Sequence, residues 1–178
     1  MNPKWNVADE KRMSASDKEK MLALGGILRR IGNFGSSCFP SSFDMRLTLQ
    51  KTVYLMQAFG LYIGFDFSWY LRGPYSPMLA HLGYEIAKME NSVPLAKFSN
   101  PESEKRFEEF LEFLGPEKDN VEWLEILASI HMQKKLHPWK HKSDILEIVV
   151  HKQSYFTIEE CREAWIYLAR HGLIGDEE

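Results

Sequence analysis

The sequence predicts a mainly α-helical fold with a minor β component, and three observations support this prediction. Apolar residues recur at the spacing of helix faces over most of the chain. Residues 65–71 alternate apolar and polar side chains, as the residues of a β-strand do. Gly, Pro and capping residues divide the chain into segments about as long as single helices. We therefore expect a compact helical domain with a very small antiparallel sheet and a C-terminal three-helix unit similar to a helix-turn-helix.

Two helices and a strand are expected in the first part of the chain. A helix over about 16–32 opens on a capping box formed by Ser16 and Glu19. The next helix, within 42–60, has apolar lines on two sides, which is typical of a central helix covered from both. The strand at 65–71 then has one heavily apolar face, made of Phe65, Phe67, Trp69 and Leu71.

A sharp corner follows this strand and introduces the next helix. Gly73 and Pro74 end the strand, because glycine tolerates strained turn angles and proline fixes φ. Ser76 can cap a helix that has Pro77 at its first position, where a missing N–H costs nothing. A proline within residues 93–98 limits that segment to a short second strand at the edge of the sheet.

Four more helices complete the predicted fold. The first, over about 101–114, turns its phenylalanines inward, and its glutamates form either a solvated face or a docking surface for a basic partner. The last three lie within 120–171 and have the lengths and tight turns of a helix-turn-helix bundle. The final one opens on a second capping box, formed by Thr157 and Glu160.

The length of 178 residues and the composition fit one domain. With 44% hydrophobic and 13% aromatic residues, the chain is predicted to be globular. We expect a flexible N-terminal tail over 1–13 and a single globular domain over 14–178. This domain would consist of a helical lobe with the Gly-Pro corner (14–115) and a three-helix lobe (116–178).

The residues present argue against several classes of protein. Cys38 and Cys161, without a CxxC motif, suit a reducing compartment and argue against a disulfide scaffold or a cysteine-rich zinc module. No apolar run reaches the roughly 20 residues that span a bilayer. Residues 1–20 lack the apolar segment of a secretory signal. We therefore expect a cytoplasmic protein without membrane contact.

No catalytic residue, cofactor or metal site is expected. His137 and His141 have the spacing of a helical metal pair, but Pro138 and Trp139 intervene and the sequence suggests no further ligand. No candidate nucleophile stands beside a candidate base. We predict a non-enzymatic protein, with a hydrolase or metal enzyme as a minor alternative.

The charge distribution leaves DNA binding as the main alternative function. The net charge is −3 and no broad basic face is predicted, but a local basic patch surrounds Trp139. The patch consists of Lys134, Lys135, Lys140 and Lys142. Against this interpretation, the first turns of the last helix carry Glu159, Glu160 and Glu163, which would repel DNA if this were the recognition helix.

A combination of short motifs resembles a known family. The motifs, in chain order, are Leu49-Gln50-Lys51, Trp69-Tyr70 and Gly73-Pro74-Tyr75-Ser76. Over about 43–80 this order is similar to that of the YwgA-like proteins of bacteria and archaea. More distantly, it resembles the Panacea domain of SocA-like antitoxins and proteolytic adaptors. Residues 120–174 resemble the YwgA-like chains more loosely, through the segment AWIYLARHGLI.

The resemblance implies a protein that binds another protein. Panacea antitoxins neutralise a toxin, and SocA-like members hand a toxin to a protease, while no catalytic residue set comes with the family. We therefore predict an antitoxin-like or proteolytic-adaptor-like interaction module. Its expected partner is a toxin-like or protease-linked protein, and a homodimer is left open.

The Gly-Pro corner admits two interpretations. In the structural one, the corner only shapes the fold, and Gln50 and Lys51 hydrogen-bond the strand or loop. In the functional one, Arg72 and Tyr75 project from the corner and contact a partner, because Arg and Tyr often anchor interfaces. The candidate partner-binding residues are Arg72, Tyr75, Gln50 and Lys51.

Overall fold

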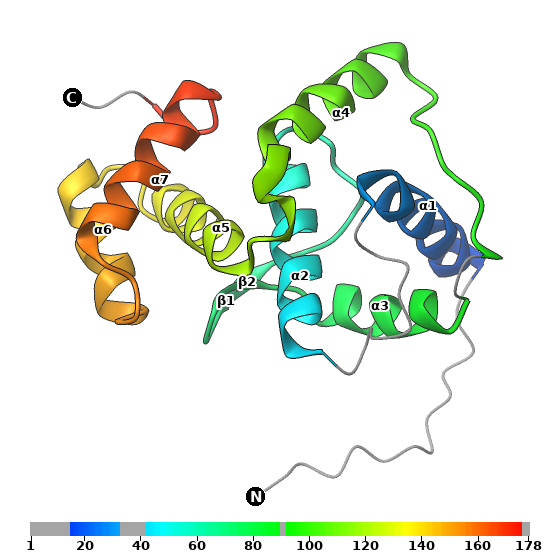
Figure 1. Ribbon diagram of the computed structural model, residues 1–178, viewed down its shortest axis with the longest axis horizontal. Coiled ribbons are helices and arrows are strands. Elements are labelled where there is room, and N and C mark those ends of the chain that lie inside the picture. The colour runs from blue at the N-terminus through cyan, green and yellow to red at the C-terminus, as the bar shows by residue number, and fades with distance from the viewer. Residues whose placement is uncertain (1–14, 33–41, 90–91, 176–178) are drawn as a thin grey trace, which may run out of the picture.

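The computed structural model describes residues 15–32, 42–89 and 92–175, and over these residues the fold is mainly α-helical with a minor β component, as predicted (Figure 1). The tail predicted over 1–13 lies outside the described residues, and so does Cys38. The described residues contain one sheet, which is antiparallel and has two strands. None of the described helices is both long enough and apolar enough to cross a membrane.

The elements follow one another as a helical lobe with the hairpin and then a three-helix unit. The first lobe contains α1 (Ala15–Ile31), α2 (Phe43–Ala58), β1 (Ser68–Tyr70), β2 (Gly73–Tyr75), α3 (Pro77–Met89) and α4 (Pro101–Leu114). A short 3-10 helix, η2 (Gly115–Asp119), leads into α5 (Val121–Leu136), α6 (Lys142–Lys152) and α7 (Ile158–Arg170).

Helices α2 and α5 form the centre of the molecule. Every residue of α2 from Leu47 to Met56 is buried, which confirms the prediction of a central helix covered on more than one side. Every residue of α5 from Leu124 to Ile130 is buried as well. Figure 1 shows α2 between α5 on one side and α1 and α3 on the other. Most buried apolar residues, from α1 through α7, belong to one continuous cluster.

The sheet is a small hairpin that closes inside the predicted corner. Its antiparallel register places Ser68 opposite Tyr75, Trp69 opposite Pro74 and Tyr70 opposite Gly73. The strand predicted over 65–71 is therefore shorter than expected. Its partner is the segment Gly73–Tyr75, although Gly73 and Pro74 were predicted to end the strand in a turn.

The prediction of a second strand over 93–98 is wrong. This segment is irregular and crosses α1 at Gly26, where an added Cβ would lie 2.5 Å from the Pro94 carbonyl oxygen. Arg30 of α1 also donates to the Ala96 carbonyl oxygen over 3.2 Å. The segment therefore packs against the surface of α1 rather than beside a strand. Gly26 has no side chain, which allows the two backbones to approach closely.

The two predicted capping boxes have different outcomes. At the start of α7, the Thr157 hydroxyl accepts from the Glu160 N–H and the Glu160 carboxylate accepts from the Thr157 N–H, as predicted. Helix α1 already begins at Ala15, so Ser16 lies within its first turn rather than at the cap position.

Candidate functional site

Gln50 of α2 holds the corner by pairing with the backbone of Ser76. Its side-chain N–H donates to the Ser76 carbonyl oxygen over 3.0 Å, and its side-chain oxygen accepts from the Ser76 N–H over 2.8 Å. Both residues are buried, and buried backbone groups are costly when unpaired. The Ser76 hydroxyl in turn accepts from the Leu79 N–H and caps α3. The predicted hydrogen bond from Gln50 to the corner is confirmed.

Lys51, the next residue of α2, places an amine beneath the same corner. Its side chain is only 1% exposed, and its Nζ donates to the Pro74 carbonyl oxygen over 2.8 Å. Burial lowers the pKa of Lys51 from 10.5 to about 7; nearby Glu125 opposes this shift and nearby Arg72 adds to it. Near neutral pH the amine is therefore divided between its charged and neutral forms.

Gly73 allows the corner to lie directly against α5. Its φ of 84° is in the left-handed region, which glycine adopts without strain. An added Cβ would lie 2.5 Å from the Ser129 Oγ of α5 and 3.5 Å from the Lys51 Nζ. The position therefore requires glycine for its backbone angle and for its close approach to the helix.

Glu125 of α5 is a fully buried carboxylate that lies against the turn of the hairpin. Its Oε2 accepts from the Arg72 Nη2 over 2.7 Å, and its Oε1 accepts from the Arg72 Nε over 2.9 Å. The Gln153 Nε2 donates to Oε1 over 2.7 Å, and the Tyr155 hydroxyl donates to the same oxygen. These donors come from the hairpin and from the connection between α6 and α7. The side chains of three residues thus donate to one carboxylate.

Arg72 and Tyr155 are both shifted in pKa by this contact. The hydrogen bond to Glu125 raises the pKa of Arg72. Burial, together with hydrogen bonding to Glu125, raises the pKa of Tyr155 to about 12. The Arg72 guanidinium also lies 4.8 Å from the centre of the Tyr155 ring and 5.6 Å from that of Phe43. The Arg72–Glu125 pair is thus flanked by two aromatic rings on its solvent side.

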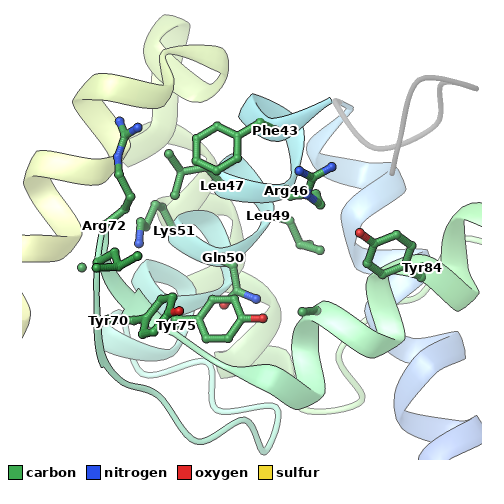
Figure 2. A pocket seen from close by; sticks show the side chains of 13 residues that line it. Phe43, Arg46, Leu47, Leu49, Gln50, Lys51, Tyr70, Arg72, Tyr75 and Tyr84 are labelled. Atoms are coloured by element: carbon green, nitrogen blue, oxygen red, sulfur yellow. The ribbon is translucent and has the colours of Figure 1, made fainter. Parts of the chain in front are cut away.

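A pocket of about 390 Å³ opens beside the hairpin, between α2, the corner and the start of α3 (Figure 2). Figure 2 shows Arg72 and Lys51 toward one end of the pocket and Tyr84 toward the other. Exposed apolar side chains form its rim, which we define as Phe43, Tyr70, Leu71 and Tyr84. Leu71 is the most exposed of them, at 75%.

The four predicted partner-binding residues all line this pocket, but they differ in accessibility. Gln50 and Lys51 are buried and bonded to the corner, so they shape the site from below. Tyr75 is half-buried, and its ring packs 5.4 Å from that of Tyr70. The side chain of Arg72 is 37% exposed, but its guanidinium is held by Glu125. The corner is thus a structural joint that also borders an open surface.

Glu125, the residue that holds this joint, was not among the residues predicted for the site. Glu125 stands alone among apolar and small residues between Leu124 and Ile130, and a lone carboxylate in such a run signals a paired buried charge. None of the four rim residues was predicted as a contact group either. Their residue types alone do not distinguish a core side chain from an exposed one.

The proposed nucleic-acid patch lies at the end of α5 and in the connection to α6. Lys134 folds back and donates to the carbonyl oxygens of Lys140, over 2.7 Å, and of Pro138, over 3.2 Å. Lys135 is exposed, whereas Lys140 and Lys142 are half-buried. Trp139 is 73% exposed and packs edge-on to His137. Lys134 therefore stabilises the connection, and the patch is less continuous than the sequence suggests.

The histidines form no metal centre in the described residues. No group of three or more His, Cys, Asp or Glu side chains there is placed to hold an ion. His131 instead shares a 2.8 Å hydrogen bond with the Tyr54 hydroxyl between α5 and α2. Burial lowers the pKa of His131 to about 4, so its ring is neutral at physiological pH.

Comparisons with protein-family models, with curated proteins and with solved structures found no match for this chain. The resemblance to YwgA-like proteins therefore stays a prediction from the motifs at the corner.

We predict that replacing Arg72 with methionine will destabilise the protein strongly. The change leaves the Glu125 carboxylate buried without its cation, which should lower the free energy of unfolding by about 2–4 kcal/mol. Arg106→Met is the matched control, because Arg106 pairs with Glu102 on the surface of α4 and should contribute less than about 1 kcal/mol. Urea unfolding measures both, and equal effects of the two substitutions would contradict the prediction.

We also predict that Lys51 makes stability depend on pH. Its pKa is about 7 in the folded protein and 10.5 in the unfolded chain, so the unfolded chain binds this proton more tightly. The free energy of unfolding of wild type relative to Lys51→Met should therefore rise between about pH 7 and pH 10, by up to about 1.4 kcal/mol per pH unit.

The control for this experiment is Lys88→Met, which changes a lysine whose side chain is 70% exposed. The difference between Lys88→Met and wild type measures what the loss of an exposed lysine does to the pH curve, because the other titrating groups cancel in the comparison. Parallel stability curves for wild type and Lys51→Met would show that Lys51 keeps an ordinary pKa.

Proposed function

We propose that the protein is a non-enzymatic interaction module that binds a partner protein through the rim of the pocket. The observation that carries this proposal is the exposure of four large apolar side chains around one concave site. Phe43, Tyr70, Leu71 and Tyr84 are 51, 57, 75 and 40% exposed, respectively. Clustered exposed apolar groups, aromatic ones above all, are typical of surfaces that bind other proteins.

The anchoring of the hairpin favours this use of the rim. Tyr70 and Leu71 stand at the tip of the hairpin, next to Arg72, which is bonded to the buried Glu125. A loop that is already fixed loses little conformational freedom on binding, so more of the contact energy is retained. The pocket between the rim residues can accept an apolar side chain of the partner.

The biological role that we propose for this binding is antitoxin-like or proteolytic-adaptor-like. This part of the proposal rests on the likeness of the Leu49–Lys51 and Gly73–Ser76 motifs to those of YwgA-like and Panacea proteins. Gln50 and Lys51 would then act by fixing the corner, and Arg72 and Tyr75 by supporting the rim.

The alternative of DNA binding receives less support. Lys134 is engaged with the backbone of its own connection. The first turn of α7 carries Glu159 and Glu160, whose negative charges would repel the phosphate backbone of DNA. The exposed Trp139 next to Lys135 and Lys140 is the remaining feature in favour of a nucleic-acid contact.

Affinity capture tests the proposal with two matched pairs of substitutions. Tyr70→Ser with Leu71→Ser removes the two large rim side chains that lie at the tip of the hairpin. Tyr62→Ser with Leu95→Ser removes a tyrosine and a leucine of similar exposure, 69 and 63%, that do not line the pocket. Both double variants should unfold at the wild-type temperature, because all four side chains are largely in water.

We expect quantitative mass spectrometry to identify a protein that wild type and the Tyr62/Leu95 variant both retain. The Tyr70/Leu71 variant should bind this partner about thirtyfold more weakly or worse, since truncating a central anchor costs about 2 kcal/mol or more. Equal retention by the two variants would exclude the rim as the binding surface.

A further inference from the structure

The amine of Lys51 has too few partners for a buried charge. Among the described residues its one hydrogen-bond partner is the Pro74 carbonyl oxygen, although an ammonium group carries three N–H donors. The side chain is almost completely buried, and a buried charge without a counter-charge is costly. The position therefore favours either a neutral amine or an anion that the described residues do not supply.

The carboxylate of Glu125 does not supply this anion. The charged groups that face Lys51 are Glu125 from α5 and Arg72 from the hairpin. Both oxygens of Glu125 already accept hydrogen bonds from Arg72, and Oε1 accepts two more from Gln153 and Tyr155. The Glu125 charge is thus matched by Arg72, and Lys51 has no carboxylate of its own.

The pocket beside Lys51 has the lining of a site for an apolar anion. The described residues that line it include the basic residues Arg46, Lys51 and Arg72 and no acidic one. Its other walls are mainly aliphatic and aromatic. A volume of about 390 Å³ falls within the range of roughly 300–1,000 Å³ that is usual for small-molecule sites.

We propose that this pocket binds a small carboxylic acid with an apolar or aromatic body. The carboxylate lies at the end formed by Lys51 and Arg72 and gives the Lys51 amine its missing acceptor. The apolar body extends between the walls toward Ala80 and Tyr84, which line the opposite part of the pocket (Figure 2). This site needs no partner protein and stands whether or not the rim binds one.

A bound carboxylate would change the proton uptake of Lys51. The amine is only partly charged near neutral pH, and an anion favours its charged form. Binding is therefore coupled to protonation, and affinity falls as the pH rises above about 7, by up to about tenfold per pH unit. A neutral ligand of the same shape has no such dependence on Lys51.

Isothermal titration with naphthoic acid and its uncharged amide, naphthamide, tests the proposal. The two probes share one apolar body, and the acid stays ionised between about pH 6 and pH 8. At pH 6 wild type should bind the acid about tenfold more tightly than the amide or better, as expected for a charge-assisted hydrogen bond. Affinity for the acid should fall between pH 7 and pH 8.

Two variants separate the role of Lys51 from that of the pocket. Lys51→Met should bind acid and amide alike, without the pH dependence. Ala80→Phe fills the pocket from α3 and leaves Lys51 in place, so it should abolish binding of both probes. The proposal is overturned if wild type binds neither probe or shows no preference for the acid. It is also overturned if the preference survives in Lys51→Met, or if Ala80→Phe binds as wild type does while still folded.

Discussion

The hydrogen bonding of the buried Glu125 carboxylate is the interaction on which the arrangement of the hairpin, α5 and the α6–α7 connection depends. Transfer of a carboxylate from water into a protein interior costs several kcal/mol unless it is paired and hydrogen-bonded. Here the compensation comes from Arg72 in the hairpin and from Gln153 and Tyr155 beyond α6. The carboxylate therefore fixes the hairpin against α5 and fixes the end of α6 against both. Gly73 makes this possible by leaving room for α5 at the corner.

The other central helix completes the joint from the opposite side. Gln50 pairs with both backbone groups of Ser76, and Lys51 donates to the Pro74 carbonyl oxygen. The segment from Arg72 to Ser76 is thus bonded to α5 through Arg72 and to α2 through Pro74 and Ser76. A hairpin fixed in this way can expose apolar side chains at its tip without becoming mobile, and this property underlies the proposed partner binding.

The two buried charges of the joint differ in how well they are satisfied. Glu125 accepts hydrogen bonds from three residues, whereas Lys51 donates to a single carbonyl oxygen. A fully satisfied buried charge is typical of a structural role. An incompletely satisfied one beside a pocket is typical of a group that binds something or titrates. This contrast separates the structural part of the site from the part that is available to a ligand.

The helical part of the fold could be predicted from sequence because its signals are local. Helical periodicity predicted α2, and the capping box of Thr157 and Glu160 predicted the start of α7. Such signals are local because a helix makes its hydrogen bonds within one segment. The pairing of β1 with Gly73–Tyr75 was not predicted, because residues 93–98 resemble a strand when their sequence is considered alone. What decides their conformation is the approach to Gly26 across the chain.

The candidate site was predictable only in part for the same reason. The Gly-Pro corner and its bonds to Gln50 and Lys51 follow from turn chemistry and from a recognisable combination of motifs. The pairing of Arg72 with Glu125 joins residues 53 positions apart, and no local pattern reports it. Burial, which distinguishes Lys51 from any surface lysine, is likewise a property of the assembled fold.

Hydrogen exchange at the Ser76 amide tests the central claim most directly, because this N–H donates to the Gln50 side chain and lies outside any helix or strand. If the corner is locked between α2 and α5, this amide exchanges only when the whole protein unfolds. Its opening free energy then equals the free energy of unfolding measured with urea. Exchange of Ser76 through a much smaller opening, while the amides of α2 and α5 stay protected, would show that the corner opens on its own and would contradict this account.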